Sequence, residues 1–159
     1  MIRIKFRVVD PDIPVTEEWR TPDHPSPYIN LQNPERDIRC LSDANEVVIE
    51  AASIFIHYDY PLRHPVTIQT NSPNGSSFTK AELIREISHT YEAIYEGEKI
   101  TSSVPAVSIA EATGGTSTLQ NRCRTTGVYG IYGHALSDLD LHTVVYNPHN
   151  RNCTLGIDS

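Results

Sequence analysis

The chain has 159 residues, which is enough for one domain with a hydrophobic core. Its 38% hydrophobic and 21% charged residues are close to the globular average and argue against global disorder. The formal net charge of -7, with only 13 basic residues, disfavours nucleic acid as a general partner, because each neutralised phosphate requires a Lys or Arg.

Cysteine usage and hydropathy indicate a reducing compartment. Cys40, Cys123 and Cys153 are widely spaced, odd in number and form no CxxC pair, which argues against a disulfide framework and a zinc cluster. The N-terminal MIRIKFRVVD alternates, so it is neither a signal peptide nor an anchor. No stretch approaches the roughly 18 apolar residues of a membrane span. We therefore expect a cytoplasmic protein without a membrane partner.

Residues 2–9 show the period-two pattern of a half-buried strand. The apolar face consists of Ile2, Ile4, Phe6 and Val8. Arg3, Lys5 and Arg7 share the other face, which is a local exception to the acidic balance. The pattern favours a solvated face, in which long basic side chains cover the strand. Nucleic-acid binding through these residues, with Arg122 and Arg124, is the alternative.

Residues 10–37 contain six prolines, which interrupt every regular period and predict an extended surface segment. Trp19 and Tyr28 are the side chains expected to hold this arm against the body of the protein. Such an arm can lie across a neighbouring subunit or cover an edge of its own sheet.

Residues 43–58 are ambiguous. Asp43 and Glu46 fit the start of a helix through Ala52, whereas SIFIHYDY alternates and is rich in β-branched and aromatic residues. We favour a strand over 47–59. VTIQT at 66–70 is its expected partner, and SPNGSS at 72–77 is a turn.

The strongest local signal is a helix over 80–96. Thr79 at the N-cap and Glu82 three residues later form a capping box, and Phe78 with Leu83 forms a hydrophobic staple. Gly97 fits the position just after the helix. One apolar stripe faces the core and consists of Leu83, Ile84, Ile87, Tyr91, Ile94 and Tyr95.

Residues 100–126 are rich in Ser, Thr, Ala and Gly and predict a flexible excursion. GGTST within it lacks the lysine and the strand-to-helix context of a phosphate loop. The chain then closes with a hairpin formed by LDLHTVVY, the turn NPHNRN and CTLGI. The predicted fold is a single α+β domain over 1–159, with an antiparallel sheet packed on one main helix.

The stretch GIYGHALSDLDLHTVVY at 130–146 allows two interpretations. Strict alternation places Asp138, Asp140, His142 and Val144 on one face, and Leu139, Leu141, Thr143 and Val145 on a core face. His134 can fold toward Asp138, so that His134, Asp138, Asp140 and His142 form a divalent-metal site. No spacing matches HExxH or another established metal motif.

The second interpretation is a braced turn, which we favour. Gly127, Gly130 and Gly133 supply positive backbone angles or close chain approach, and Tyr129 and Tyr132 pack between them. A donor from His134 to a backbone carbonyl, or an Asp138 cap on nearby amides, then holds the turn without chemistry.

Four stretches together carry a family resemblance from about residue 53 to the C-terminus. They are YPL...PVTIQT, FTKAELIREISHTYEAIY, GVYGIYGHALSDLDLHTVVY and CTLGIDS. They resemble uncharacterised small proteins of large cytoplasmic DNA viruses, including marseillevirus-like ones, with scattered fungal and algal relatives. The most specific part is Gly130 to Leu139, although Tyr132 stands where relatives often have Trp and Ala135 where they commonly have an acid. The resemblance implies a viral origin and expression in the host cytoplasm, and it leaves packaging in the virion open.

Two functions follow as hypotheses. The first is a non-enzymatic structural or interaction protein that acts as a homodimer, with other viral or host proteins as further partners and no cofactor. Its expected contact residues are Trp19, Tyr28, Tyr129 and Tyr132. The alternative is a small metal-dependent hydrolase or nuclease in which His134 and Asp138 are catalytic and Asp140 and His142 complete the metal site.

Overall fold

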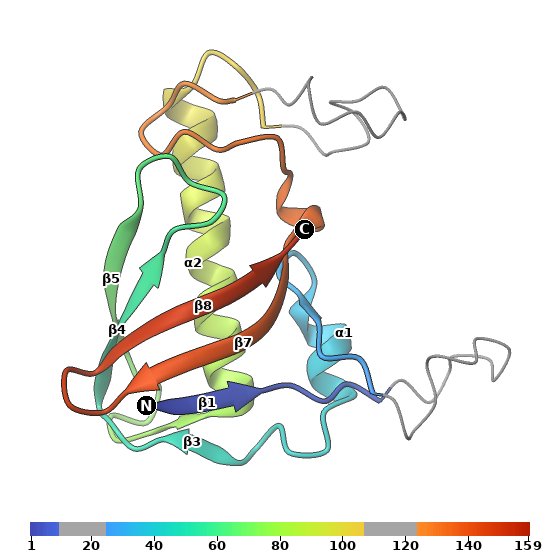
Figure 1. Cartoon of the computed structure of the whole chain (residues 1–159), viewed down its shortest axis with the longest axis vertical. Helices are drawn as coiled ribbons and strands as arrows, with labels where there is room; N and C mark the ends of the chain where they lie inside the picture. The colour runs from blue at the N-terminus through green and yellow to red at the C-terminus, as the bar shows by residue number, and fades with distance from the viewer. Residues whose placement is uncertain (10–24, 107–123) are drawn as a thin grey trace, which may run out of the picture.

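The computed structural model describes residues 1–9, 25–106 and 124–159 (Figure 1). The predictions for Trp19, for the arm over 10–24 and for the excursion over 107–123 lie outside these residues. The α+β class is confirmed, because a sheet of several strands packs against one long helix, α2 (Lys80–Thr101). None of the described helices is both long and apolar enough to cross a membrane.

The main sheet has six strands, and five of them follow the order β1-β7-β8-β4-β5. Their bounds are β1 (Ile2–Lys5), β7 (Asp140–Asn147), β8 (Asn152–Asp158), β4 (Ser53–Tyr58) and β5 (Val66–Asn71). The predicted hairpin is confirmed as β7 and β8, and the predicted partner of β4 is confirmed as β5. One pair departs from the expected antiparallel sheet, since β4 and β8 run parallel, so the sheet is mixed.

The strand β1 is the edge of the sheet beside β7. Its predicted apolar face is buried at Ile4, as are Phe6 and Val8 beyond the strand, but Ile2 is 45% exposed, which corrects its assignment to the core. The buried ammonium of Lys80 pairs with Asp43 and donates to the carbonyl of Lys5 at 3.2 Å. This contact ties the end of β1 to the start of α2.

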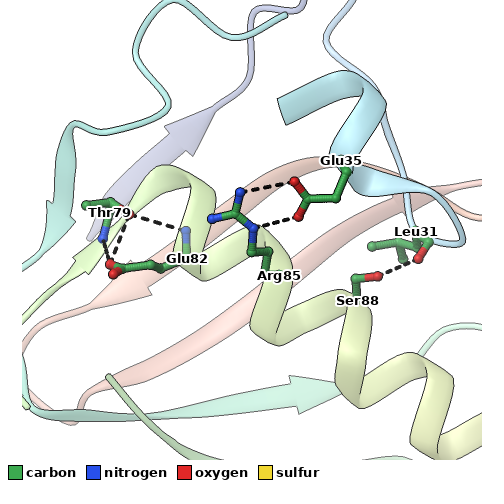
Figure 2. A network of polar contacts seen from close by, with 6 residues as sticks. All are labelled: Leu31, Glu35, Thr79, Glu82, Arg85 and Ser88. Carbon is green, nitrogen blue, oxygen red and sulfur yellow. Dashed lines mark hydrogen bonds and ion pairs between the residues drawn. The ribbon is translucent and has the colours of Figure 1, made fainter. Parts of the chain in front are cut away.

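The N-terminus of α2 confirms the predicted capping box (Figure 2). The backbone N–H of Glu82 donates to Thr79 Oγ1 at 3.2 Å, and the Glu82 carboxylate accepts from the Thr79 N–H at 2.8 Å. The predicted end of the helix is wrong. α2 continues through Gly97 to Thr101. At Gly97 a Cβ would come within 3.3 Å of the Tyr129 ring, so the glycine gives this ring room against the helix.

The core lies between α2 and one face of the sheet, and Figure 1 shows the helix running behind the strands. The predicted stripe is confirmed: five of its residues are buried, and the sixth, Tyr95, is half-buried against the same core. Tyr91 is fully buried and meets the Tyr58 ring of β4 edge to face, with 5.2 Å between the ring centroids.

The described part of the proline-rich arm covers the protein's own sheet. β2 (Ile29–Asn30) pairs with β7 beyond the end of β1. The prediction of an extended chain as far as residue 37 is wrong, because Pro34 begins the short helix α1 (Pro34–Arg39). Proline suits this first position, since it has no backbone N–H to leave unpaired.

Two contacts fasten this segment to α2, and both are visible in Figure 2. The guanidinium of Arg85 donates to the Glu35 carboxylate of α1 at 2.6 and 3.1 Å. Ser88 Oγ donates to the buried carbonyl of Leu31 at 2.6 Å.

The single strand predicted over 47–59 is two strands, and its helical alternative is wrong. β3 (Val47–Ile49) pairs with β6 (Phe78–Thr79) in a separate two-stranded sheet, whereas β4 belongs to the main sheet. Residues 50–52 connect them outside any strand. The sequence predicted one strand because alternation of polar and apolar residues does not show which other strand each segment pairs with.

A β-bulge in β7 corrects the predicted faces. Leu141 pairs with Ile157, but Thr143 pairs with Gly156, so His142 is the additional residue. After it, Val144 and Tyr146 are buried instead of Thr143 and Val145. The His142 ring lies against Gly156, where a Cβ would stand 2.5 Å from it. His142 therefore lies on the face of the sheet away from α2.

Candidate functional site

The glycine-rich loop closes around one buried carboxylate. Glu98, near the end of α2, is 1% exposed. Its carboxylate accepts hydrogen bonds from the backbone N–H groups of Gly127 at 2.8 Å, Tyr129 at 2.7 Å and Gly130 at 3.1 Å, and from Thr125 Oγ1 at 2.5 Å. Four donors thus satisfy one buried charge, and the loop is fixed to the helix.

The predicted role of the glycines is confirmed. Gly130 and Gly133 have φ angles of 68° and 60°, in the left-handed region that favours glycine. Gly127 serves close approach, since a Cβ there would lie 2.7 Å from the Glu98 carboxylate and 2.5 Å from Thr101 Oγ1.

Glu98 itself was missed by the sequence analysis. The available signal was the loop, whose closely spaced glycines leave backbone N–H groups accessible to an acceptor. The acceptor is 29 residues away from Gly127, and no local pattern links the two. The hydrogen bonds to the Glu98 carboxylate stabilise the loop. Because Glu98 is buried and its carboxylate accepts from four groups of the loop, the carboxylate is not exposed to a ligand.

His134 is also buried, at 1% exposure, beside the segment that follows β4. Its Nε2 shares a hydrogen bond of 2.9 Å with the Tyr60 hydroxyl, which shares another of 2.6 Å with Ser159 Oγ. The His134 carbonyl accepts from the Tyr95 hydroxyl at 3.0 Å. The Nε2 atom of the ring therefore contacts a side-chain hydroxyl. Tyr60 and Ser159 were not among the candidates.

Asp138 and Asp140 both hold backbone or side-chain amides. Asp138 belongs to the 3₁₀ turn η2 (Leu136–Asp138), and its carboxylate accepts from the Ala135 N–H at 2.8 Å. This contact confirms the predicted cap. Asp140, in β7, accepts from Asn30 Nδ2 of β2 at 3.1 Å.

His142 lies on the face of the sheet away from α2, and its partners differ from those of His134, Asp138 and Asp140. Its Nδ1 is 3.0 Å from Thr143 Oγ1, its Nε2 is 3.8 Å from the Asp158 carboxylate, and its ring meets that of Tyr28 edge to face. The four proposed metal ligands are thus held by different partners. Within residues 1–9, 25–106 and 124–159, no group of three or more His, Cys, Asp or Glu side chains is placed to hold a metal ion.

The tyrosines predicted as contact residues differ in accessibility. Tyr28 is 41% and Tyr132 is 38% exposed, and the guanidinium of Arg124 lies 5.3 Å from the centre of the Tyr132 ring. A hydrogen bond to Asp158 raises the pKa of Tyr28. Tyr129 is instead half-buried and packs against the core.

A groove of about 600 Å³ lies where β1, β3 and the β7–β8 turn meet. Two apolar side chains at the groove stay exposed, Ile2 at 45% and Val47 at 47%. Glu50 and Arg151, both exposed, place one negative and one positive charge on its lining. The sequence analysis missed this groove, because it depends on β3 leaving the main sheet.

No protein-family model, characterised protein or solved structure matches this chain. The resemblance to a viral family stays a prediction.

Proposed function

We propose that this protein is a non-enzymatic interaction protein that forms a homodimer through the groove between β1, β3 and the β7–β8 turn. The observation that carries the proposal is the exposure of Ile2 and Val47 beside this groove. Burying exposed aliphatic side chains against a partner is favourable, and symmetric dimers are the commonest oligomers.

The groove has a charge pattern that can complement itself in a two-fold interface. Such an interface places the same patch of both protomers face to face, so the patch must complement itself. Glu50 and Arg151 supply one charge of each sign. In the proposed two-fold dimer, Glu50 of one protomer would lie opposite Arg151 of the other.

Pairing of β1 with β1 of a second copy is the competing geometry, and the basic side chains of β1 disfavour this pairing. Arg3 and Lys5 point outward from this edge strand, so antiparallel pairing would place like charges near one another. Contact through the groove avoids this repulsion.

The enzyme alternative has less support. A hydrolytic metal site requires ligands that converge on one point and leave a position for water. His134 contacts Tyr60, Asp138 caps Ala135, and the other two candidates contact further side chains. These contacts favour a braced turn.

Multi-angle light scattering of the full chain tests the dimer. We expect twice the monomer mass at micromolar concentration, and Glu50→Arg or Arg151→Glu should each raise the dimer dissociation constant on the order of tenfold. The double variant, Glu50→Arg with Arg151→Glu, should restore dimerisation because it restores the opposite charges.

A matched control uses the exposed pair of Glu96 and Lys99 on α2, whose charged atoms are 3.9 Å apart. Glu96→Arg and Lys99→Glu change charge equally and should leave the mass unchanged. A monomer at all concentrations, or a double variant no better than the single ones, would refute the proposed interface.

Viral origin, expression in the host cytoplasm and packaging in the virion form a further part of the proposal, supported by the sequence resemblance alone. Mass spectrometry of purified virions and of infected-cell cytoplasm tests it. If peptides of this protein are found in the infected-cell cytoplasm but not in the virion, the result would support a viral origin and contradict packaging in the virion.

A further inference from the structure

Three basic side chains form a row on the outer side of the N-terminal segment. Arg3, Lys5 and Arg7 are exposed, whereas the residues between them, Ile4 and Phe6, are buried. None of the three basic residues forms an ion pair with an acidic residue in the part of the chain that the structure describes. Among residues 1–9, 25–106 and 124–159, the row therefore has an exposed side and no carboxylate paired with it.

The spacing of the row suits a polyanion with a regular repeat. Alternate residues of an extended strand lie about 6.7 Å apart on the same side. This distance is comparable with the separation of successive phosphates along an extended single strand. Arg3 and Lys5 lie opposite Val145 and Thr143 of β7, which carry no charge.

Two rings lie beside the same row. After β1, Val8 pairs with Ser26, two residues before Tyr28. Tyr28 is 41% exposed and meets the His142 ring edge to face, with 6.3 Å between the centroids. His142 reaches this surface because of the bulge in β7 and because Gly156 leaves room for its ring. Tyr28 is exposed and His142 is half-buried, and aromatic rings at the surface beside a row of cations provide surfaces on which bases can stack.

We propose that this face binds single-stranded nucleic acid, with phosphates along Arg3, Lys5 and Arg7 and bases on Tyr28 and His142. This binding goes beyond the proposed dimer and uses a different set of side chains.

An acidic peptide is the competing occupant. It would use the cations but has no need for the adjacent rings, so the pairing of rings and cations favours nucleic acid. The net charge of -7 disfavours general affinity for nucleic-acid backbones, single-stranded or duplex, so binding depends on the local row of cations and on the rings beside it. The carboxylate of Asp158 lies beside the rings and would repel a phosphate. The proposal places a base at the rings and the phosphates along the row of cations.

Fluorescence anisotropy with a labelled oligothymidylate of about 12 nucleotides, within the usual range of single-strand sites, tests the proposal. Binding should weaken with salt, and Arg3→Gln/Lys5→Gln/Arg7→Gln should raise Kd at least about tenfold and reduce the salt slope by about 2. Arg36→Gln/Arg39→Gln/Lys99→Gln removes the same charge from the two helices and should leave Kd unchanged.

Three further variants separate stacking from charge and do not depend on the folding of the triple variant. Tyr28→Thr should raise Kd about tenfold, whereas Tyr28→Phe should retain affinity because it keeps the ring. Arg3→Lys/Arg7→Lys should also retain it. Light scattering of each variant shows whether the dimer persists, so a failure of dimerisation is distinguishable from a failure of binding.

Three outcomes would overturn the inference. They are an absence of binding at low salt, an unchanged Kd for Tyr28→Thr, and equal displacement of the oligonucleotide by polyglutamate or by duplex DNA. Polyglutamate displacement would assign the row of cations to acidic peptides instead.

Discussion

The carboxylate of Glu98 accepts a 2.7 Å hydrogen bond from the backbone N–H of Tyr129, 31 residues further along the chain. With the amides of Gly127 and Gly130 and the hydroxyl of Thr125, this contact makes one helix residue the acceptor for an entire loop. The loop in turn carries Tyr132 and leads to His134, so these two predicted site residues depend on Glu98 for their position.

Replacing Glu98 by Gln should destabilise the protein by about 2 kcal/mol or more, because the amide presents a donor to other donors and leaves buried N–H groups unpaired. Urea denaturation followed by circular dichroism measures the change. Glu96→Gln, on the exposed side of the same helix, is the control and should change stability little. Equal stability of the two variants would contradict this role of Glu98.

The contribution of Glu98 should depend on pH. Burial alone would raise the pKa of Glu98, but hydrogen bonds from Thr125 and the loop amides lower it below the usual 4.5. A carboxyl group whose pKa is lower in the folded state adds stability above its unfolded pKa and loses it as the pH falls through its folded pKa. The stability difference between wild type and Glu98→Gln should therefore be constant near neutrality and shrink below pH 4.5. A difference that grows on acidification would have the wrong sign.

Gly127→Ala should destabilise the protein more than Gly75→Ala. The new methyl group at 127 would lie 2.7 Å from the Glu98 carboxylate, whereas nothing lies within 4 Å at 75, where only a φ of 74° opposes alanine. We expect a loss of about 1 kcal/mol at Gly75, from backbone strain, and a larger loss at Gly127. Thermal unfolding of both variants measures the order, and the reverse order would refute the close packing.

Tyr60→Phe should lower the stability by about 1 to 2 kcal/mol, because it removes the hydroxyl that contacts buried His134 and also Ser159. Chemical denaturation measures this loss. Tyr132→Phe is the matched control, since its hydroxyl has no hydrogen bond with the residues that the structure describes. A similar, small effect of both substitutions would mean that the Tyr60 hydroxyl contributes nothing to the fold.

Several elements followed from the sequence alone because their causes are local. The capping box of Thr79 and Glu82 and the apolar period of α2 involve residues within a few turns. The alternation of the N-terminal strand and the turn between β7 and β8 are equally local. The Asp138 cap spans three residues, which is why it was predictable.

The tertiary structure decided what depends on distant partners. The register between β7 and β8 interrupts the alternation at His142. β3 pairs with β6 and not with the strands of the main sheet. α2 extends to Thr101, beside the loop that surrounds Glu98. His134 turned to Tyr60, 74 residues away, so four residues close in sequence did not form one cluster. Local sequence determines which conformations a segment favours, but burial and hydrogen bonding between segments far apart in the chain determine which residues finally meet.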